Sequence, residues 1–223
     1  IHGGGADLEF PHHTNEIAQS EAKTGKTFAN YWMHNGFVNI DNVKMSKSLG
    51  NFITVHDALK TIDGQVLRFF FATQHYRKPI NFTEKAVRDA ETNLKYLKNT
   101  YEQPFAGEVD PADLQGFVDK FIVAMDEDIN AANGITVVFE LAKWINSGHY
   151  NQDVKDALTK MLEVFGVVFV EEVLDADIEA LIAERQEARA KKDFARADAI
   201  RDELAAQGIK LLDTKEGVRW TRD

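Results

Sequence analysis

The sequence predicts a mainly helical protein that begins with a small α/β part and ends with a small α+β part. Apolar residues recur at helical spacing over residues 111–131, 133–147 and 151–170. Stretches near both ends of the chain favour strands instead, because β-branched and aromatic residues there flank polar turns. The 223 residues include 44% hydrophobic residues and no cysteine, so a core must form without disulfide bonds.

The first elements lie around glycines and one proline. Three glycines at positions 3–5 are expected to break any strand that began before them. Pro11 suits the first turn of a helix and Gly25 suits its end, which predicts a helix between them. Residues 30–40, NYWMHNGFVNI, predict a strand with a turn, and residues 43–51, VKMSKSLGN, predict a polar loop that ends with glycine.

Three helix signals follow this loop. Thr54 is a suitable N-cap for a short helix. Residues 64–74, GQVLRFFFATQ, are apolar at helical spacing and predict a buried helix. Thr83 and Glu84 are expected to open a long helix that runs to about Tyr101.

The remaining elements follow a proline-containing boundary. Pro104 and Pro111, with Gly107 between them, separate the first part from the helices beyond it. From Asp175 two further helices are expected, broken near Asp193. The last sixteen residues, GIKLLDTKEGVRWTRD, contain two short β-type runs around a polar turn and predict a hairpin.

Charge is unevenly distributed along the chain. The formal net charge is −10, but residues 1–100 carry +2, residues 101–180 carry −13 and residues 181–223 carry +1. Both ends therefore remain suitable for contact with a polyanion, whereas an acidic middle is usually a solvated helix face. No apolar run approaches a membrane span, and the first residues do not form a signal peptide. We therefore expect a soluble, cytoplasmic protein without a membrane partner.

The first candidate site is the segment HGGGADLEFPHHTNE. Its glycines allow a backbone to approach a ligand closely, and Asp7 is placed to bind ribose hydroxyls, although a plain tight turn explains the same glycines. His12 and Glu16 lie four residues apart, so a helix puts them on one face, where both could ligate zinc. Such a pair is more often a surface contact.

The second and third candidate sites carry basic residues. Lys44 and Lys47 flank a serine in a glycine-ended loop, which suits a mobile clamp on phosphates, although a solvated loop is the alternative. Near the C-terminus, a base could stack on Phe194 while arginines on the surrounding helices meet phosphates. An ordinary amphipathic helical hairpin is the alternative. The arginines concerned are Arg185, Arg189, Arg196 and Arg201.

Six segments, taken in order, resemble cysteinyl-tRNA synthetases, which are class I aminoacyl-tRNA synthetases. They are HGGGADLEFPHHTNEIAQSEA, YWMHNGFV, KMSKSLGNF, FATQHYRKPINF, MDEDINAANGI and ERQEARAKKDFARADAIRDELAAQGIKLLDT, with Trp220 closing the series. The KMSKS string alone indicates only class I synthetases, and the PHHTNE and KDFARAD strings narrow the resemblance to the cysteine enzymes.

The resemblance implies an organisation in three parts. Residues 1–82 would be the second half of a class I Rossmann-type catalytic domain with its KMSKS loop. Residues 83–173 would be a helical bundle that binds the tRNA, and residues 174–223 a small α+β domain that recognises the anticodon. The family's first half, which carries a HIGH-type motif, has no counterpart here, so the isolated chain is expected to be inactive.

The resemblance also implies roles for single residues. Gly3, Gly4 and Asp7 match the segment that holds the adenosine of ATP. Lys47 matches the lysine that contacts the ATP phosphates, with Lys44 assisting. Zinc in the family is held by two upstream cysteines, a histidine and a glutamate, and His12 and Glu16 match the last two. The positions that match the family's anticodon readers are Arg189, Phe194, Asp198 and Asp213.

The activity implied for the complete enzyme is the ligation of cysteine to tRNA. ATP with Mg²⁺ would activate L-cysteine to cysteinyl-adenylate, and the cysteine would pass to tRNA(Cys), with zinc distinguishing a thiolate from a hydroxyl. A monomer is expected. Two alternatives remain: a stand-alone tRNA-binding module, and a ligase of the mycothiol-pathway type that joins cysteine to a small amine. The second needs no anticodon reader, so the KDFARAD segment argues against it.

Overall fold

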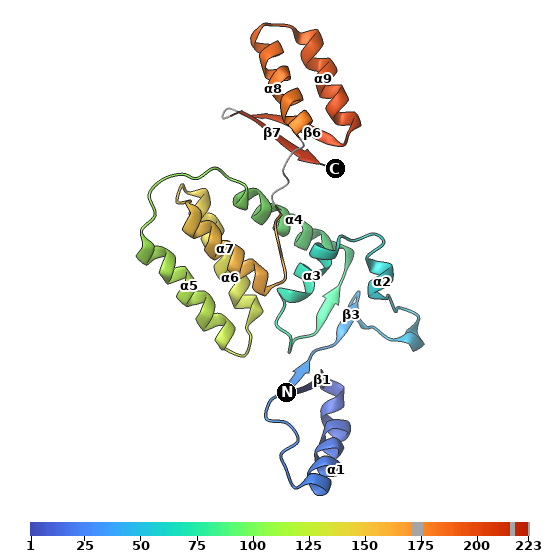
Figure 1. Ribbon diagram of the computed structural model, residues 1–223. Coiled ribbons are helices and arrows are strands. Elements are labelled where there is room, and N and C mark those ends of the chain that lie inside the picture. The colour runs from blue at the N-terminus through green and yellow to red at the C-terminus, as the bar shows by residue number, and fades with distance from the viewer. Residues whose placement is uncertain (171–175, 215–216, 223) are drawn as a thin grey trace. The chain divides into compact units, whose positions relative to one another are not determined.

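The computed structural model describes residues 1–170, 176–214 and 217–222, without the side chains at 176, 177, 212–214, 217, 219, 221 and 222. The chain divides into two compact units, residues 1–169 and residues 170–223 (Figure 1). Most of the described residues are helical, with three small sheets, which confirms the predicted fold class. Among these residues, no helix has the length and apolar character needed to cross a bilayer.

The first unit begins with a parallel pair of strands joined by a helix (Figure 1). Strand β1 (His2–Gly5) pairs with β2 (Trp32–Asn35), and α1 (Thr14–Thr24) lies between them in the chain. Two short segments lead into α1, the 3₁₀ turn η1 (Ala6–Leu8) and η2 (Glu9–His13), which is kinked at Phe10 because that residue has extended backbone angles. Helix α1 ends at Gly25, which adopts the left-handed conformation (φ 65°) that ends many helices.

The expectation that glycines 3–5 break a strand is wrong, because all three lie within β1. Each of the four β1 residues has a partner in β2. A Cβ atom added to Gly4 would lie 2.9 Å from Leu8 Cδ1 and 3.0 Å from His13 Cε1. Glycine is therefore needed here for close packing within a strand, and not for a turn.

A second sheet of three strands follows in the order β4–β3–β5. Strands β3 (Val38–Ile40) and β4 (Val43–Lys44) form a hairpin, and Asp41 and Asn42 at its turn have positive φ values (49° and 66°). Strand β5 (Ile80–Phe82) pairs in parallel with β3. Between β4 and β5 lie η3 (Lys47–Leu49), α2 (Val55–Ala58) and α3 (Gly64–Ala72).

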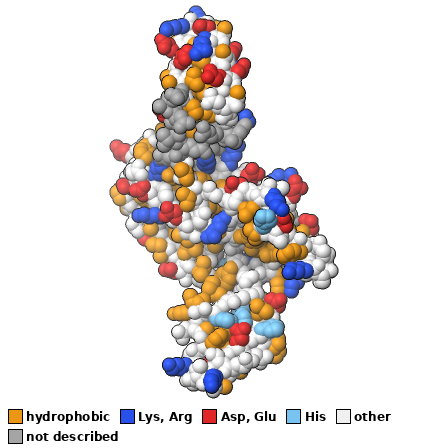
Figure 2. Space-filling view, turned by 45° about the vertical axis from the view of Figure 1, so that its right-hand side comes forward, with side chains coloured by type: hydrophobic (Ala, Val, Ile, Leu, Met, Phe, Trp, Pro, Cys, Tyr) orange, Lys and Arg blue, Asp and Glu red, His pale blue; other side chains and the backbone are white. Residues whose placement is uncertain are grey.

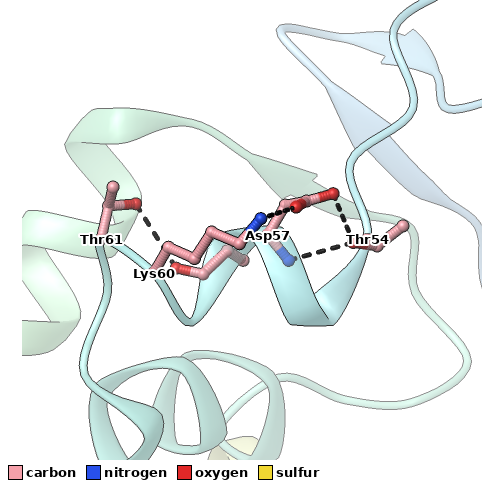
Figure 3. A network of polar contacts seen from close by, with 5 residues as sticks. Thr54, Asp57, Lys60 and Thr61 are labelled. Carbon is pink, nitrogen blue, oxygen red and sulfur yellow. Dashed lines mark hydrogen bonds and ion pairs between the residues drawn. The ribbon is translucent and has the colours of Figure 1, made fainter.

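Helix α2 begins at the predicted N-cap (Figure 3). Thr54 Oγ1 accepts a hydrogen bond from Asp57 N–H at 3.0 Å and donates to Asp57 Oδ2 at 2.7 Å. Lys60 Nζ lies 2.6 Å from Asp57 Oδ1. The hydrogen bonds from Lys60 and Thr54 hold the pKa of the Asp57 carboxyl below its usual value.

Four helices complete the first unit, and together with α3 they surround its core (Figure 1). They are α4 (Glu84–Tyr101), α5 (Pro111–Asp126), α6 (Ala131–Asn146) and α7 (Gln152–Val164). Helix α4 has the predicted bounds and the predicted Thr83 cap. Helices α5 and α7 end five and six residues before the expected positions, since each is followed by residues that leave the helical path.

Two arginines join the strand-containing part of the first unit to its helices. Arg77 Nε and Nη2 donate to Asp128 Oδ2 and Oδ1 at 2.5 and 3.1 Å, and Tyr76 O–H donates to Asp128 Oδ1 at 2.7 Å. Arg68 Nε donates to the carbonyl of Phe165 at 3.0 Å. These contacts span 51 and 97 residues of chain, so no local sequence pattern predicts them.

The second unit is a pair of helices on a hairpin. Helices α8 (Ala176–Ala190) and α9 (Phe194–Ala206) are separated near Asp193, which caps α9 by accepting from Arg196 N–H at 3.1 Å. The predicted hairpin is present as antiparallel strands β6 (Ile209–Thr214) and β7 (Gly217–Arg222). The unit has its own core of Ile178, Ile200, Leu204 and Ile209.

Candidate nucleotide, metal and nucleic-acid sites

A cluster of histidines and aromatic rings lies beside β1 and α1, where Figure 2 shows histidine side chains gathered on one part of the surface. His2 Nε2 lies 2.7 Å from a carboxylate oxygen of Glu16. The ring of His13 lies 4.6 Å from that of His2, and His13 Nδ1 lies 2.8 Å from His34 Nε2. Trp32 packs against both His2 and His13, with ring centroids 5.0 and 5.6 Å away.

Three members of this cluster could hold a metal ion. One ligand atom each from His2, His13 and Glu16 lies within 4.8 Å of the other two. Imidazole nitrogen and carboxylate oxygen are common zinc ligands, so this donor set fits zinc. His13 is buried, with 5% of its surface exposed, and Glu16 is exposed.

The histidines that lie close to Glu16 in the structure are not the one that the sequence predicted. His12 is exposed and is not one of the three clustered residues, although it lies four positions before Glu16. His2 and His13 were missed as neighbours of Glu16. The adjacent histidines of the PHHTNE string signalled His13, whereas the position of His2 depends on the pairing of β1 with β2.

The two predicted nucleotide-binding segments meet at Asp7 and Lys44. Asp7 Oδ2 lies 3.7 Å from Lys44 Nζ, and both side chains are about half exposed. Lys44 Nζ also lies 3.8 Å from the centre of the Phe37 ring, in the geometry of a cation–π contact. Gly3 and Gly4 pair with Met33 and His34 of the neighbouring strand, so they reach this region as part of β1.

Residues 44–51, here called the lysine loop, form a compact turn that follows β4. Ser46 Oγ accepts from Leu49 N–H at 3.3 Å, and Gly50 (φ 68°) donates its N–H to the Lys47 carbonyl at 3.3 Å. Lys47 is exposed, with its ammonium 5.6 Å from the Phe52 ring. The loop is anchored to the sheet because Met45 N–H donates to the Val38 carbonyl at 3.0 Å.

Asn51 was not identified by the sequence analysis. Its Oδ1 accepts from Ser46 N–H at 3.0 Å, and its Nδ2 donates to the Lys44 carbonyl at 3.3 Å. One side chain therefore links two backbone positions at the start of the lysine loop. The asparagine that follows glycine in KMSKSLGN was the only sequence signal for it.

The predicted nucleic-acid surface of the second unit centres on Phe194. This ring lies at the start of α9 and is 62% exposed. Arg189 is in the last turn of α8, and Asp198 pairs with Arg201 at 3.1 Å. Asp213 lies in β6, and its side chain is outside the described part of the structure.

One of the four arginines predicted on helical surfaces is buried, and another forms an ion pair between the helices. Arg185 was expected on a helical surface, but only 6% of it is exposed. Arg196 pairs with Glu184 on the other helix, Nε to Oε1 at 2.8 Å. This pair raises the pKa of the arginine and lowers that of the glutamate. Arg196 therefore joins α8 to α9.

Family models match nearly the whole chain. Residues 1–92 match the tRNA synthetases class I (C) catalytic domain, residues 120–171 match the DALR domain, and residues 171–220 match the cysteinyl-tRNA ligase anticodon binding domain. The predicted boundaries at 82/83 and 173/174 stay predictions. The contacts within the structure separate only residues 1–169 from residues 170–223.

Curated relatives match all 223 residues. The chain is 85% identical to the cysteine–tRNA ligase of Streptococcus pneumoniae serotype 4, 82% to that of Streptococcus mutans and 76% to that of Streptococcus agalactiae serotype III. In each case the match covers the whole chain and 50% of the relative, so the chain spans half the length of these proteins. These matches confirm the resemblance that the motifs indicated.

A solved structure shares the fold. The LeuRS of Agrobacterium radiobacter K84, in a ternary complex with tRNA and LeuAMS, superposes with a TM-score of 0.55 and 16% identity. The match covers 73% of this chain and 25% of that one. At this identity the likeness concerns the fold alone.

Proposed function

Because the chain is similar over its whole length to cysteine–tRNA ligases, we propose that its complete gene product is a cysteine–tRNA ligase. The enzyme would activate L-cysteine with ATP and Mg²⁺ to cysteinyl-adenylate and pyrophosphate, and then transfer cysteine to tRNA(Cys). The observation that carries this proposal is the meeting of the HGGGAD segment with the lysine loop at Asp7 and Lys44. It puts a candidate ribose ligand beside candidate phosphate ligands.

Lys47 is the residue to which we assign stabilisation of the phosphate charge. Negative charge grows on the phosphates as the α-phosphate bond to pyrophosphate breaks, and an ammonium held nearby stabilises that charge more than the ground state. Both lysines are exposed, but the Lys44 ammonium already contacts Asp7 and the Phe37 ring, whereas the Lys47 ammonium lies 5.6 Å from the Phe52 ring. We therefore assign the larger effect to Lys47 and a supporting one to Lys44.

The zinc site proposed for this enzyme includes His12 and Glu16, with two thiolates from outside the 223 residues. Zinc would supply a soft Lewis acid that binds the substrate thiolate and discriminates against serine. The clustering of Glu16 with His2 and His13 supports a metal site at this edge of the sheet. His2 and His13 are the alternative imidazoles. Their packing against Trp32 would hold Glu16 in place through His2.

The second unit is proposed to bind tRNA. Phe194 would stack on an unpaired base, and Arg189 would contact the nucleotides around that base. Asp198 and Asp213 are further proposed anticodon contacts. The match of residues 171–220 to an anticodon binding domain supports this role, and it favours the tRNA ligase over the ligase for a small amine.

The test of this function is cysteine-dependent exchange of pyrophosphate into ATP, together with charging of tRNA(Cys). The complete gene product should show both. Lys47→Ala should lower the exchange rate about 100-fold or more, because its loss removes transition-state stabilisation, while the Kd for tRNA(Cys) stays within about twofold.

Lys85→Ala is the matched control, since Lys85 pairs with Asp89 on the surface of α4, far along the chain from the loop. It should exchange at the wild-type rate. Absence of cysteine-dependent exchange in the wild-type protein would refute the proposed function. Exchange by Lys47→Ala at the wild-type rate would refute the role of Lys47 alone.

A further inference from the structure

We propose that Asn51 is a positioning residue, which holds the lysine loop in the shape that presents Lys44 and Lys47 to the phosphates of ATP. The inference rests on the function proposed above. It concerns a residue that touches no reacting atom and acts through the backbone of the loop.

The Asn51 amide pairs with two backbone groups of the lysine loop. Its oxygen accepts from Ser46 N–H at 3.0 Å, and its nitrogen donates to the Lys44 carbonyl at 3.3 Å. These two backbone groups lie on either side of Met45, between the two lysines. A single planar amide thereby fixes the direction in which the chain leaves Lys44 and enters the turn.

Other backbone hydrogen bonds hold the loop as well. Leu49 N–H bonds to Ser46 Oγ, and Gly50 N–H bonds to the Lys47 carbonyl, so these contacts stay within the turn. The Met45 N–H bond to the Val38 carbonyl ties the loop to β3 on one side. Asn51 connects the end of the turn back to that anchored side.

The chemistry of the Asn51 side chain suits these two partners. Only a group with both an acceptor and a donor can satisfy Ser46 N–H and the Lys44 carbonyl together, and an amide of this length provides both. An aspartate at position 51 would keep the acceptor but would face the Lys44 carbonyl without a donor. Asn51→Asp therefore removes one of the two bonds while keeping the size of the side chain.

Loss of the Asn51 contacts should affect the rate of adenylate formation. The stabilisation of charge depends on where the ammonium groups of Lys44 and Lys47 lie when the phosphate bond breaks. A displacement of about 1 Å in a catalytic group can cost about 100-fold in rate. Loosening the loop should lower kcat for adenylate formation. The KM for cysteine should change little, since the zinc and histidine region does not involve the loop.

The experiment uses the complete gene product with Asn51→Ala and Asn51→Asp. Both variants should lower kcat for cysteine-dependent ATP–pyrophosphate exchange, by about 10- to 100-fold for Asn51→Ala and less for Asn51→Asp, with KM for cysteine within twofold. Trypsin should cleave after Lys44 and Lys47 faster in both variants, because a looser loop is a better protease substrate.

Asn151→Ala is the matched control. Asn151 caps α7 by accepting from Val154 N–H at 3.0 Å, so the same substitution removes a comparable backbone contact within the helical bundle. It should lower the melting temperature and leave kcat and cleavage of the loop unchanged.

A kcat for Asn51→Ala within twofold of wild type would overturn the inference. If Asn51→Ala fails to fold, Asn51→Asp decides, and wild-type kcat in that variant would overturn it. An equal loss of activity in Asn151→Ala would also do so, since it would show that lost stability explains the effect. Wild-type exchange is measured in parallel. Its absence would refute the proposed function, whereas its presence together with an unaffected Asn51→Ala variant would refute only the role of Asn51.

Discussion

At the scale of single residues, the two adjacent histidines before α1 lie in different surroundings. His12 is exposed, whereas His13 is buried beside His34 and Trp32, where a Cβ atom at Gly4 would lie only 3.0 Å from its ring. We predict that His12→Ala lowers the zinc content of the complete gene product at least tenfold without lowering the melting temperature of the metal-free protein. His13→Ala should instead lower that melting temperature, because it leaves a cavity. Metal analysis and thermal unfolding measure the two effects.

Glu16→Gln provides the positive control for metal loss, since a neutral amide is a poorer zinc ligand than a carboxylate. Full zinc content in His12→Ala together with loss in His13→Ala would contradict the assignment of His12. It would make His13 the ligand, in agreement with the cluster that the structure forms around Glu16.

The sequence signalled candidate site residues, but it did not signal the residues that contact them. The lysines and Asp7 were identified because their motifs are local. Their partners Phe37 and Asn51 were not, since a side chain that supports a loop carries no chemistry of its own to signal it. Arg185 was placed on a surface because arginine is usually exposed, and its burial depends on how α8 packs within its unit.

At the scale of elements, the turn between α5 and α6 is held by a charged contact to the segment before β5. Two hydrogen bonds from Arg77 and one from Tyr76 lower the pKa of the Asp128 carboxyl to about 2. A carboxyl whose pKa is lowered on folding stabilises the fold above its unfolded pKa, about 3.9, and loses that effect as the pH falls towards 2. Asp128→Asn should therefore lower the melting temperature at pH 7, and the difference from wild type should shrink between pH 5 and 2.

Asparagine is the suitable replacement at this position, because Asp128 has a positive φ (55°) that asparagine tolerates. Asp89→Asn is the control, since Asp89 forms an ordinary exposed pair with Lys85 within α4. A melting temperature difference for Asp128→Asn that stays constant from pH 7 to pH 2 would argue against the stabilising role of the ionised carboxylate.

Elements with local end signals were the most predictable. Thr54, Thr83 and Asp193 cap α2, α4 and α9 at or near the expected places, because capping is a contact between residues two or three apart. Strand β1 was missed since three successive glycines have little intrinsic preference for a strand. Its formation depends on pairing with β2, thirty residues further along the chain.

At the scale of the whole molecule, the net charge differs between the parts of the chain. Residues 101–180 carry a net −13 and lie largely within the bundle that the resemblance predicts to bind tRNA, so we propose that basic contacts to the tRNA phosphates come from the flanking residues. We predict that Phe194→Ala weakens binding of tRNA(Cys) by about 1–3 kcal/mol, the usual contribution of one stacked base. Filter binding at several salt concentrations should show the loss at each, because stacking involves no released counterions.

Phe105→Ala is the control for Phe194→Ala. Phe105 is also about half exposed, but it packs on Tyr150 in the first unit, with ring centroids 5.2 Å apart. Its replacement should leave tRNA affinity unchanged. Equal affinities of the Phe194→Ala variant and the wild type would refute base stacking by Phe194, and unchanged binding after Arg189→Ala as well would support a packing role for α8 and α9.

The parallel pairing of β1 and β2 has a consequence for handling the isolated 223 residues. Parallel strands in proteins almost always belong to larger sheets that are covered on both faces. Within the described residues this sheet has two strands, and Ile1, Phe10 and Tyr31 near it are largely exposed. Its outer edges present backbone groups to which a strand of another molecule could bond. Purified on its own at high concentration, the chain should therefore be prone to self-association. Its solutions need to be checked for aggregates before any measurement on it.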